Sequence, residues 1–120
     1  MTEMEQSTNL LKIRRVLREL GVPEHLSGHG YLEEAALLCL EEPQYLRRIT
    51  GGLYPAVADK FRVTASQVDR AIRHAIETAW LRCDARTMNR YFGNTVNPQR
   101  GKPMNSEFVA RLTSAVRLGE

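Results

Sequence analysis

Residues 54–82, YPAVADKFRVTASQVDRAIRHAIETAWLR, decide the fold of this chain. Pro55 stands near the start of the stretch, where a helix loses nothing by the missing N–H group. The apolar residues that follow have the spacing of one helix face, and they are Val57, Ala58 and Phe61. This pattern predicts a short helix over residues 54–61, followed by a tight connection of three residues, Arg62-Val63-Thr64.

A longer helix is predicted over about residues 65–82. Thr64 and Gln67 fit a capping box, in which the threonine hydroxyl and the glutamine side chain each satisfy a free backbone N–H group. Trp80 closes an apolar stripe and is expected to anchor this helix to the core. The stripe advances in three- and four-residue steps, as in an amphipathic helix, through Val68, Ala71, Ile72, Ala75, Ile76, Ala79 and Trp80. Two helices joined by about three residues cross at a steep angle, so a helix-turn-helix is predicted.

The outer face of the second helix carries the candidate DNA-binding residues, which are Ser66, Gln67, Asp69, Arg70, Arg73 and His74. A recognition helix enters the major groove with its N-terminal residues toward the base edges. There Arg70 has the donors to bind guanine O6 and N7, and Gln67 is expected to pair with adenine or bond a phosphate. Asp69 is expected to accept from cytosine or to orient one of the two arginines, and Ser66 to bond a phosphate oxygen. The alternative is an ordinary surface helix with a solvated polar face.

The rest of the chain also has helical periodicity, and no segment alternates with a period of two. Ahead of the helix-turn-helix, helices are predicted over about residues 8–20, 30–41 and 44–50. The predicted fold class is all-α, a compact bundle of about six helices. Residues 1–8 are expected to be a flexible N-terminal segment, and residues 9–118 the helical DNA-binding domain.

Beyond the helix-turn-helix, two more helices are predicted. Asp84 is expected to cap a small helix that ends at Gly93. Residues 94–104 are typical of an exposed loop, and Asn105 or Ser106 is expected to cap the final helix. The inward residues of that helix are predicted to be Phe108, Val109, Leu112, Ala115 and Val116.

Composition and charge narrow the class of protein. At 120 residues, with 42% hydrophobic and 26% charged residues, the chain fits one globular domain. No apolar run approaches the roughly 20 residues that cross a bilayer, and the polar N-terminus is unlike a secretory signal, so a cytoplasmic protein with no membrane partner is expected. Residues 1–61 carry seven Lys or Arg against nine Asp or Glu, a net charge of −2, whereas residues 62–111 carry nine against four, a net charge of +5. A basic second half suits a polyphosphate partner.

Neither a metal site nor a cofactor is predicted, and an enzyme is not expected. Cys39 and Cys83 lie far apart in helical segments and are expected to be reduced and packed. His25, His29 and His74 do not form a metal-ligand spacing with either cysteine. The sequence also has no Gly-rich phosphate loop and no nucleophile motif.

Several blocks of the sequence together resemble one family. One block is Leu53-Tyr54-Pro55, and the specific one is the run Arg70-Ala71-Ile72-Arg73-His74-Ala75-Ile76-Glu77. Further blocks are Gly21-Val22-Pro23, Tyr31-Leu32-x-Glu34-Ala35, Phe92-Gly93-x-Thr95-Val96 and Lys102-Pro103-x-Asn105-Ser106-Glu107-Phe108. Over about residues 9–118 the chain resembles the C-terminal effector domain of the master response regulator that initiates sporulation in endospore-forming bacteria.

This resemblance implies a compact helical domain that binds a short box of double-stranded DNA and activates or represses transcription. It implies tandem boxes occupied head-to-tail by two domains, and a contact with the RNA polymerase sigma subunit from the segment after Trp80. It further implies that Arg70 contacts guanine, and that Arg73, His74 and Ser66 mainly contact the DNA backbone. The family's full protein carries an N-terminal receiver domain, which residues 1–120 do not include, so the chain is expected to be an excised domain or a free-standing relative.

The chain departs from the family pattern at three places. Gln67 stands where the family is expected to have arginine, and Asp69 where it is expected to have glutamate. These differences are expected to relax or change the preferred DNA box. Arg86 and Arg90 make the segment after Trp80 more basic than the resemblance implies.

The alternative function is a protein-interaction module, or an antagonist, that binds a related regulator or RNA polymerase without reading DNA. The final helix, about residues 106–118, is a candidate for a dimer contact, although its apolar stripe is expected to complete the core. A DNA-binding domain loses affinity steeply as salt rises, whereas a protein-only adaptor has no DNA affinity even at low salt.

Overall fold

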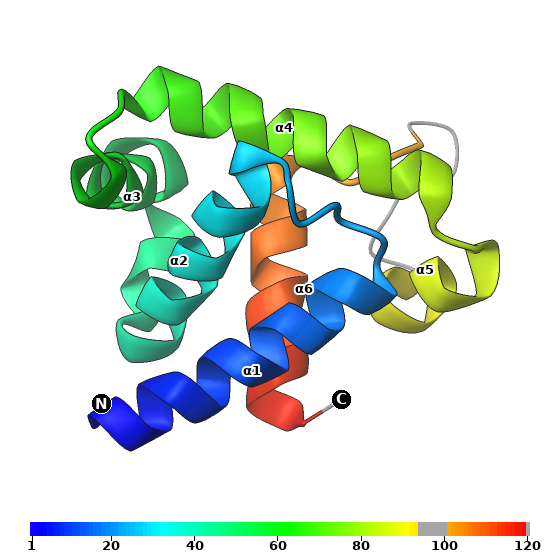
Figure 1. The fold of residues 1–120 in the computed structure, drawn as a ribbon, viewed down its shortest axis with the longest axis horizontal. Coiled ribbons are helices and arrows are strands. Elements are labelled where there is room, and N and C mark those ends of the chain that lie inside the picture. Colours follow the sequence, from blue (N-terminus) through cyan, green and yellow to red (C-terminus); the bar gives the residue numbers. More distant parts are fainter. Residues whose placement is uncertain (94–100, 120) are drawn as a thin grey trace.

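The computed structural model describes residues 1–93 and 101–119, and every regular element in them is helical (Figure 1). The elements are α1 (Glu3–Glu19), α2 (Ser27–Glu41), the 3-10 helix η1 (Pro43–Arg47), the π-helix η2 (Ile49–Leu53), α3 (Tyr54–Phe61), α4 (Ala65–Arg82), α5 (Ala85–Phe92) and α6 (Asn105–Leu118). The predicted all-α class, with six α-helices in this part of the chain, is confirmed. None of these helices is long and apolar enough to cross a membrane.

The helix α4 lies along one side of the molecule, supported by α2, α3 and α6 (Figure 1). The helix α1 packs on α2 and α6 on the side away from α4. The short helix α5 follows the C-terminal end of α4, whereas α3 lies at its N-terminal end. One face of α4 is therefore covered by the bundle while the opposite face is left to solvent.

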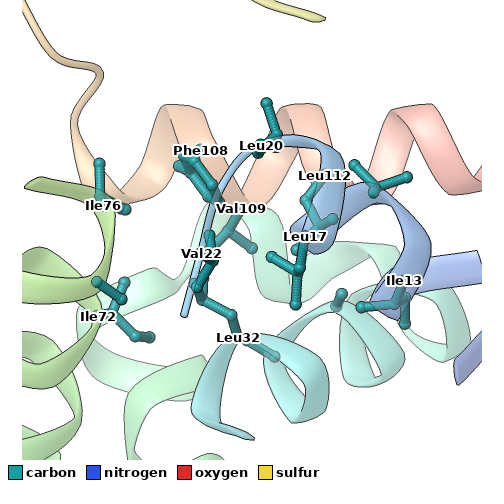
Figure 2. Close-up of a cluster of buried hydrophobic side chains, with 14 of the residues drawn as sticks. Ile13, Leu17, Leu20, Val22, Leu32, Ile72, Ile76, Phe108, Val109 and Leu112 are labelled. Atoms are coloured by element: carbon teal, nitrogen blue, oxygen red, sulfur yellow. The ribbon is translucent and has the colours of Figure 1, made fainter. Parts of the chain in front are cut away.

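One hydrophobic cluster holds these helices together, with side chains from all six α-helices, from η2 and from the connection between α1 and α2. Figure 2 shows the part of it that lies between α1, α2, α4 and α6. Ile72 and Ile76 bring α4 into this cluster, and Phe108 does the same for α6. Burying side chains of this size contributes about 1.5–3 kcal/mol each, so the cluster fixes how α4 sits on the bundle. Its largest fully buried members are Phe108, Ile13, Leu17, Leu20, Leu32, Leu53, Ile72, Ile76 and Leu112.

The helices α2 and α4 approach very closely near Gly28. A Cβ atom added there would lie 2.2 Å from the carbonyl oxygen of Ala71 and 2.7 Å from the Cβ of Ala75. Real Cβ atoms do not come this close to other heavy atoms. Gly28 is thus required for the contact between the two helices, rather than for a special backbone angle.

Several boundaries differ from the predictions. The first helix begins at Glu3, not near residue 8, because the Thr2 hydroxyl caps it by accepting from the Glu5 N–H group. The side chains of residues 1–8 are nevertheless all exposed. The second helix also begins early, at Ser27, and the predicted short helix near 44–50 is instead the pair η1 and η2.

The C-terminal predictions are confirmed in part. Asp84 caps α5 by accepting from the Thr87 N–H group at 2.8 Å, as predicted. Neither Asn105 nor Ser106 caps α6, because the cap position falls on Met104, whose N–H group donates to the Glu107 carboxylate at 3.0 Å. Of the predicted loop, residues 94–100 lie outside the described part of the chain, and residues 101–104 precede α6 without regular structure.

Candidate nucleic-acid interface

The helices α3 and α4 are joined by a three-residue turn set by Arg62, which is the arrangement that the predicted helix-turn-helix requires. This residue has φ 57° and ψ 46°, and it is the one non-glycine residue with positive φ among those that the structure describes. Its left-handed conformation ends α3, and the next N–H group, that of Val63, donates to the Ala58 carbonyl at 3.0 Å. A left-handed residue with a Cβ costs about 1–2 kcal/mol, so the surrounding packing must hold the turn in place.

The predicted capping box at the start of α4 is confirmed. The Thr64 hydroxyl accepts from the Gln67 N–H group at 3.0 Å, and the Gln67 side-chain oxygen accepts from the Thr64 N–H group at 2.8 Å. Pairing with adenine needs both the oxygen and the nitrogen of a glutamine amide. The cap already uses the Gln67 oxygen, so the NH₂ group is the part of this side chain that has no partner within the cap.

The carboxylate of Asp69 is also engaged within the protein. One of its oxygens accepts from Arg73 Nη2 at 2.6 Å, and the other accepts from Asn105 Nδ2 at 3.1 Å. The Asp69 side chain is 34% exposed and that of Arg73 is 49% exposed. Of the roles predicted for Asp69, orienting an arginine fits this geometry, and the arginine is Arg73.

The remaining predicted residues, Ser66, Arg70 and His74, are exposed and recur every four positions along α4. This spacing places them in one row on the solvent face of the helix. Within residues 1–93 and 101–119, none of their side chains makes a hydrogen bond or an ion pair. The six predicted site residues thus fall into two sets: a row of three uncommitted side chains, and three (Gln67, Asp69 and Arg73) that already have partners.

Two residues beyond α4, Lys102 and Asn105, complete this surface, and neither was predicted as a site residue. Lys102 donates to the Glu77 carboxylate at 2.5 Å, which ties the segment before α6 to α4 and holds the pKa of Glu77 below its usual value. Asn105 donates to the hydroxyl of Tyr54 at 3.0 Å. Burial is the main cause that raises the pKa of Tyr54, so this hydroxyl stays protonated at neutral pH.

A pocket of about 350 Å³ opens between η2, α4 and the start of α6. Its polar lining includes Thr50, Asp69, Arg73, Lys102 and Asn105. The sequence signal for this side of the surface was the Lys102–Phe108 block of the family resemblance. That block gave no role to Lys102 or to Asn105. The pairing of Asn105 with α4 depends on the packing of α6 and could not be inferred from spacing.

No group of three or more metal-binding side chains comes together in the described part of the chain. Cys39 is buried and Cys83 half-buried, and neither forms a disulfide. Burial raises the pKa of Cys39 to about 11, and burial, followed by the charge of Asp84, raises that of Cys83. Both thiols therefore stay protonated at neutral pH, as packed cysteines do.

Comparison with protein families agrees with this architecture. Residues 13–116 match the model of the family described as sporulation initiation factor Spo0A C terminal. The matched region contains the whole helix-turn-helix and nearly all of the surface described above. The family consists of regulatory effector domains that generally bind DNA, and it is not a family of enzymes. The chain therefore belongs to the family of C-terminal effector domains of the sporulation initiation factor Spo0A.

Proposed function

We propose that this chain binds a short box of double-stranded DNA in a sequence-specific manner, with α4 in the major groove, and so regulates transcription. The observation that carries the proposal is the row formed by Ser66, Arg70 and His74, exposed and without partners in the described chain, on the second helix of a helix-turn-helix. Two donors and a hydroxyl at this spacing suit base edges and phosphates.

Four exposed residues of α4 then have a role in binding DNA. Arg70 has no acidic partner among the described residues, so its guanidinium is available to bind guanine O6 and N7. Ser66 and His74, at the two ends of the row, bond phosphate oxygens. Arg73 reaches the DNA backbone from its contact with Asp69. The first two N–H groups of α4, which precede the capped N–H group of Gln67, have no acceptor within the helix and favour a phosphate near Ser66.

The proposal is tested by selecting the preferred box from randomised duplex DNA, followed by titration in fluorescence anisotropy. The chain is expected to bind the selected box far more tightly than random duplex, with affinity that falls steeply as salt rises. Arg70→Ala should weaken binding to the selected box and flatten the preference at one base pair. Arg47→Ala removes the same charge from the exposed face of η1 and is the matched control. The proposal fails if low salt reveals no binding, or if all sequences bind equally.

A second contact, with the RNA polymerase sigma subunit, is supported by the C-terminal end of α4. Leu81 is 86% exposed there, and the half-buried Trp80 lines an apolar pocket with Met88 and Phe92. An apolar pocket that includes a partly exposed tryptophan offers a protein partner apolar surface to cover. Leu81→Ser should weaken binding to purified sigma subunit and leave DNA affinity unchanged. Binding to that subunit without any DNA affinity would instead support the interaction-module function.

The remaining parts of the proposal concern assembly and location. Two domains bind head-to-tail on tandem boxes, so a duplex with two boxes should take up two chains in analytical ultracentrifugation, and one box should take up one. Residues 9–118 are the proposed DNA-binding unit. Since its partner is the chromosome, the proposed location is the cytoplasm.

A further inference from the structure

The amide nitrogen of Asn105 is shared among three oxygens on two other helices. It lies 3.0 Å from the Tyr54 hydroxyl of α3, 3.1 Å from the backbone carbonyl of Asp69, and 3.1 Å from the Asp69 carboxylate in α4. Both Asp69 oxygens can only accept, so the amide must present its NH₂ group to them. Asn105 is the first residue of α6, and through these contacts it joins α6 to both α3 and α4.

The contact continues toward the solvent face of α4. Asn105 holds one oxygen of the Asp69 carboxylate, and the other oxygen accepts from Arg73 Nη2 at 2.6 Å. A carboxylate held on one side by an amide has a fixed plane, and an arginine bonded to its other side acquires a fixed direction. An arginine that makes only an i,i+4 pair on a helix surface is restrained weakly.

We propose that Asn105 is a positioning residue of the DNA-binding surface: its amide holds the Asp69 carboxylate, and through it fixes the direction of the Arg73 guanidinium. The inference rests on the proposed function, because it requires that the outer face of α4 meets DNA. It also assigns Asp69 to positioning rather than to base reading, since its two carboxylate oxygens accept from Asn105 and Arg73.

The test is a double-mutant cycle on DNA affinity, measured by anisotropy with the whole chain and the selected box. Asn105→Ala should lower the affinity about 3- to 10-fold, the equivalent of one ordinary hydrogen bond. The double variant with Arg73→Ala should bind no worse than Arg73→Ala alone, because Asn105 acts through Arg73. Asn105 is uncharged, yet its loss should also reduce the slope of log affinity against log salt by up to about one, since a cation moves away from a phosphate.

Two further variants separate positioning from stability. Asn105→Leu keeps the size of the side chain and removes its donor, so it should lose affinity as Asn105→Ala does, and it carries the test if the alanine variant does not fold. Asn89→Ala makes the same change on the exposed face of α5 and should bind like the parent chain. All titrations are run at a temperature at which circular dichroism shows every variant folded.

The outcomes are distinct. The inference is supported if the parent chain binds DNA, if the double variant binds no worse than Arg73→Ala alone, and if Asn105→Ala has a reduced salt slope. The inference is overturned, while the proposed function stands, if the parent chain binds DNA and one of three results is found. These are fully additive losses in the double variant, an unchanged salt slope for Asn105→Ala, or parent-like affinity of Asn105→Leu. Absence of any DNA binding by the parent chain overturns both.

Discussion

Replacing Gly28 by alanine is expected to destabilise the domain by wedging α2 away from α4. The new Cβ would lie 2.2 Å from the Ala71 carbonyl oxygen and 2.7 Å from the Ala75 Cβ. Real Cβ contacts are almost never shorter than 3.0 Å and ordinarily measure 3.4–4 Å, so the two helices must separate by roughly 1 Å or more. A backbone carbonyl in the middle of a helix cannot rotate away, so the strain has to spread into the packing around it.

Overpacking of a well-packed core costs about 1–3 kcal/mol, and the rigid neighbour places this variant toward the upper end, at about 2 kcal/mol after the gain from alanine's better helix propensity. For 120 residues, this corresponds to a fall in Tm of about 8 °C. Gly30→Ala is the matched control, because its Cβ would meet nothing closer than 3.9 Å, at the Phe61 ring. That variant should be more stable than the parent by about 0.5–1 kcal/mol.

Urea unfolding followed by circular dichroism, with thermal melts of both variants, measures these differences. The decisive quantity is the gap of about 2.5–3 kcal/mol between the two glycine positions, since both variants gain the same side chain on the same helix. If Gly28→Ala melts within 1 °C of the parent, or if both variants shift together, then the close approach of α2 and α4 does not limit the packing.

Three other changes have expected outcomes. Arg70→Ala should cost about 1–3 kcal/mol in binding to the selected box and flatten the preference at one base pair, and an equal loss on random duplex would contradict base reading. Trp80→Ala should destabilise by about 1–3 kcal/mol in urea unfolding, less than the 3–5 kcal/mol of a fully buried aromatic, because this side chain is only half-buried. Burial raises the pKa of Cys39 from 9.0 to about 11 in the folded state, so its contribution to stability is present below pH 9 and is lost as the pH rises toward 11. The Tm of Cys39→Ala should therefore fall less than that of the parent between pH 8 and 11. Parallel curves of Tm against pH for the two proteins would show that the Cys39 thiol does not cause the fall.

The helix-turn-helix could be predicted because its signals are local. The capping box at Thr64 and Gln67 needs only two side chains three residues apart, and the apolar stripe of α4 needs only the period of one helix. The same reasoning placed all six candidate residues on α4. It put the start of α1 too late because a polar first turn, capped by Thr2, has no apolar stripe to mark it.

The contacts between side chains on different helices could not be predicted from the sequence. Asp69 and Asn105 are 36 residues apart, and they meet only because α6 packs beneath α4. The close contact at Gly28 likewise involves Ala71 on another helix, and a glycine near the start of a helix gives no sign of it. Contacts of this kind depend on how helices pack, which periodicity within one helix does not determine.

The division of the α4 surface into committed and uncommitted positions has a consequence for how its specificity can change. Ser66, Arg70 and His74 support no other part of the described fold, so mutation can exchange them at almost no cost in folding. Changes at Gln67 or Asp69 also disturb the helix cap or the contact with Asn105. New DNA targets are therefore expected to arise first by substitution along the row of three, with the other positions changing only when their partners change too.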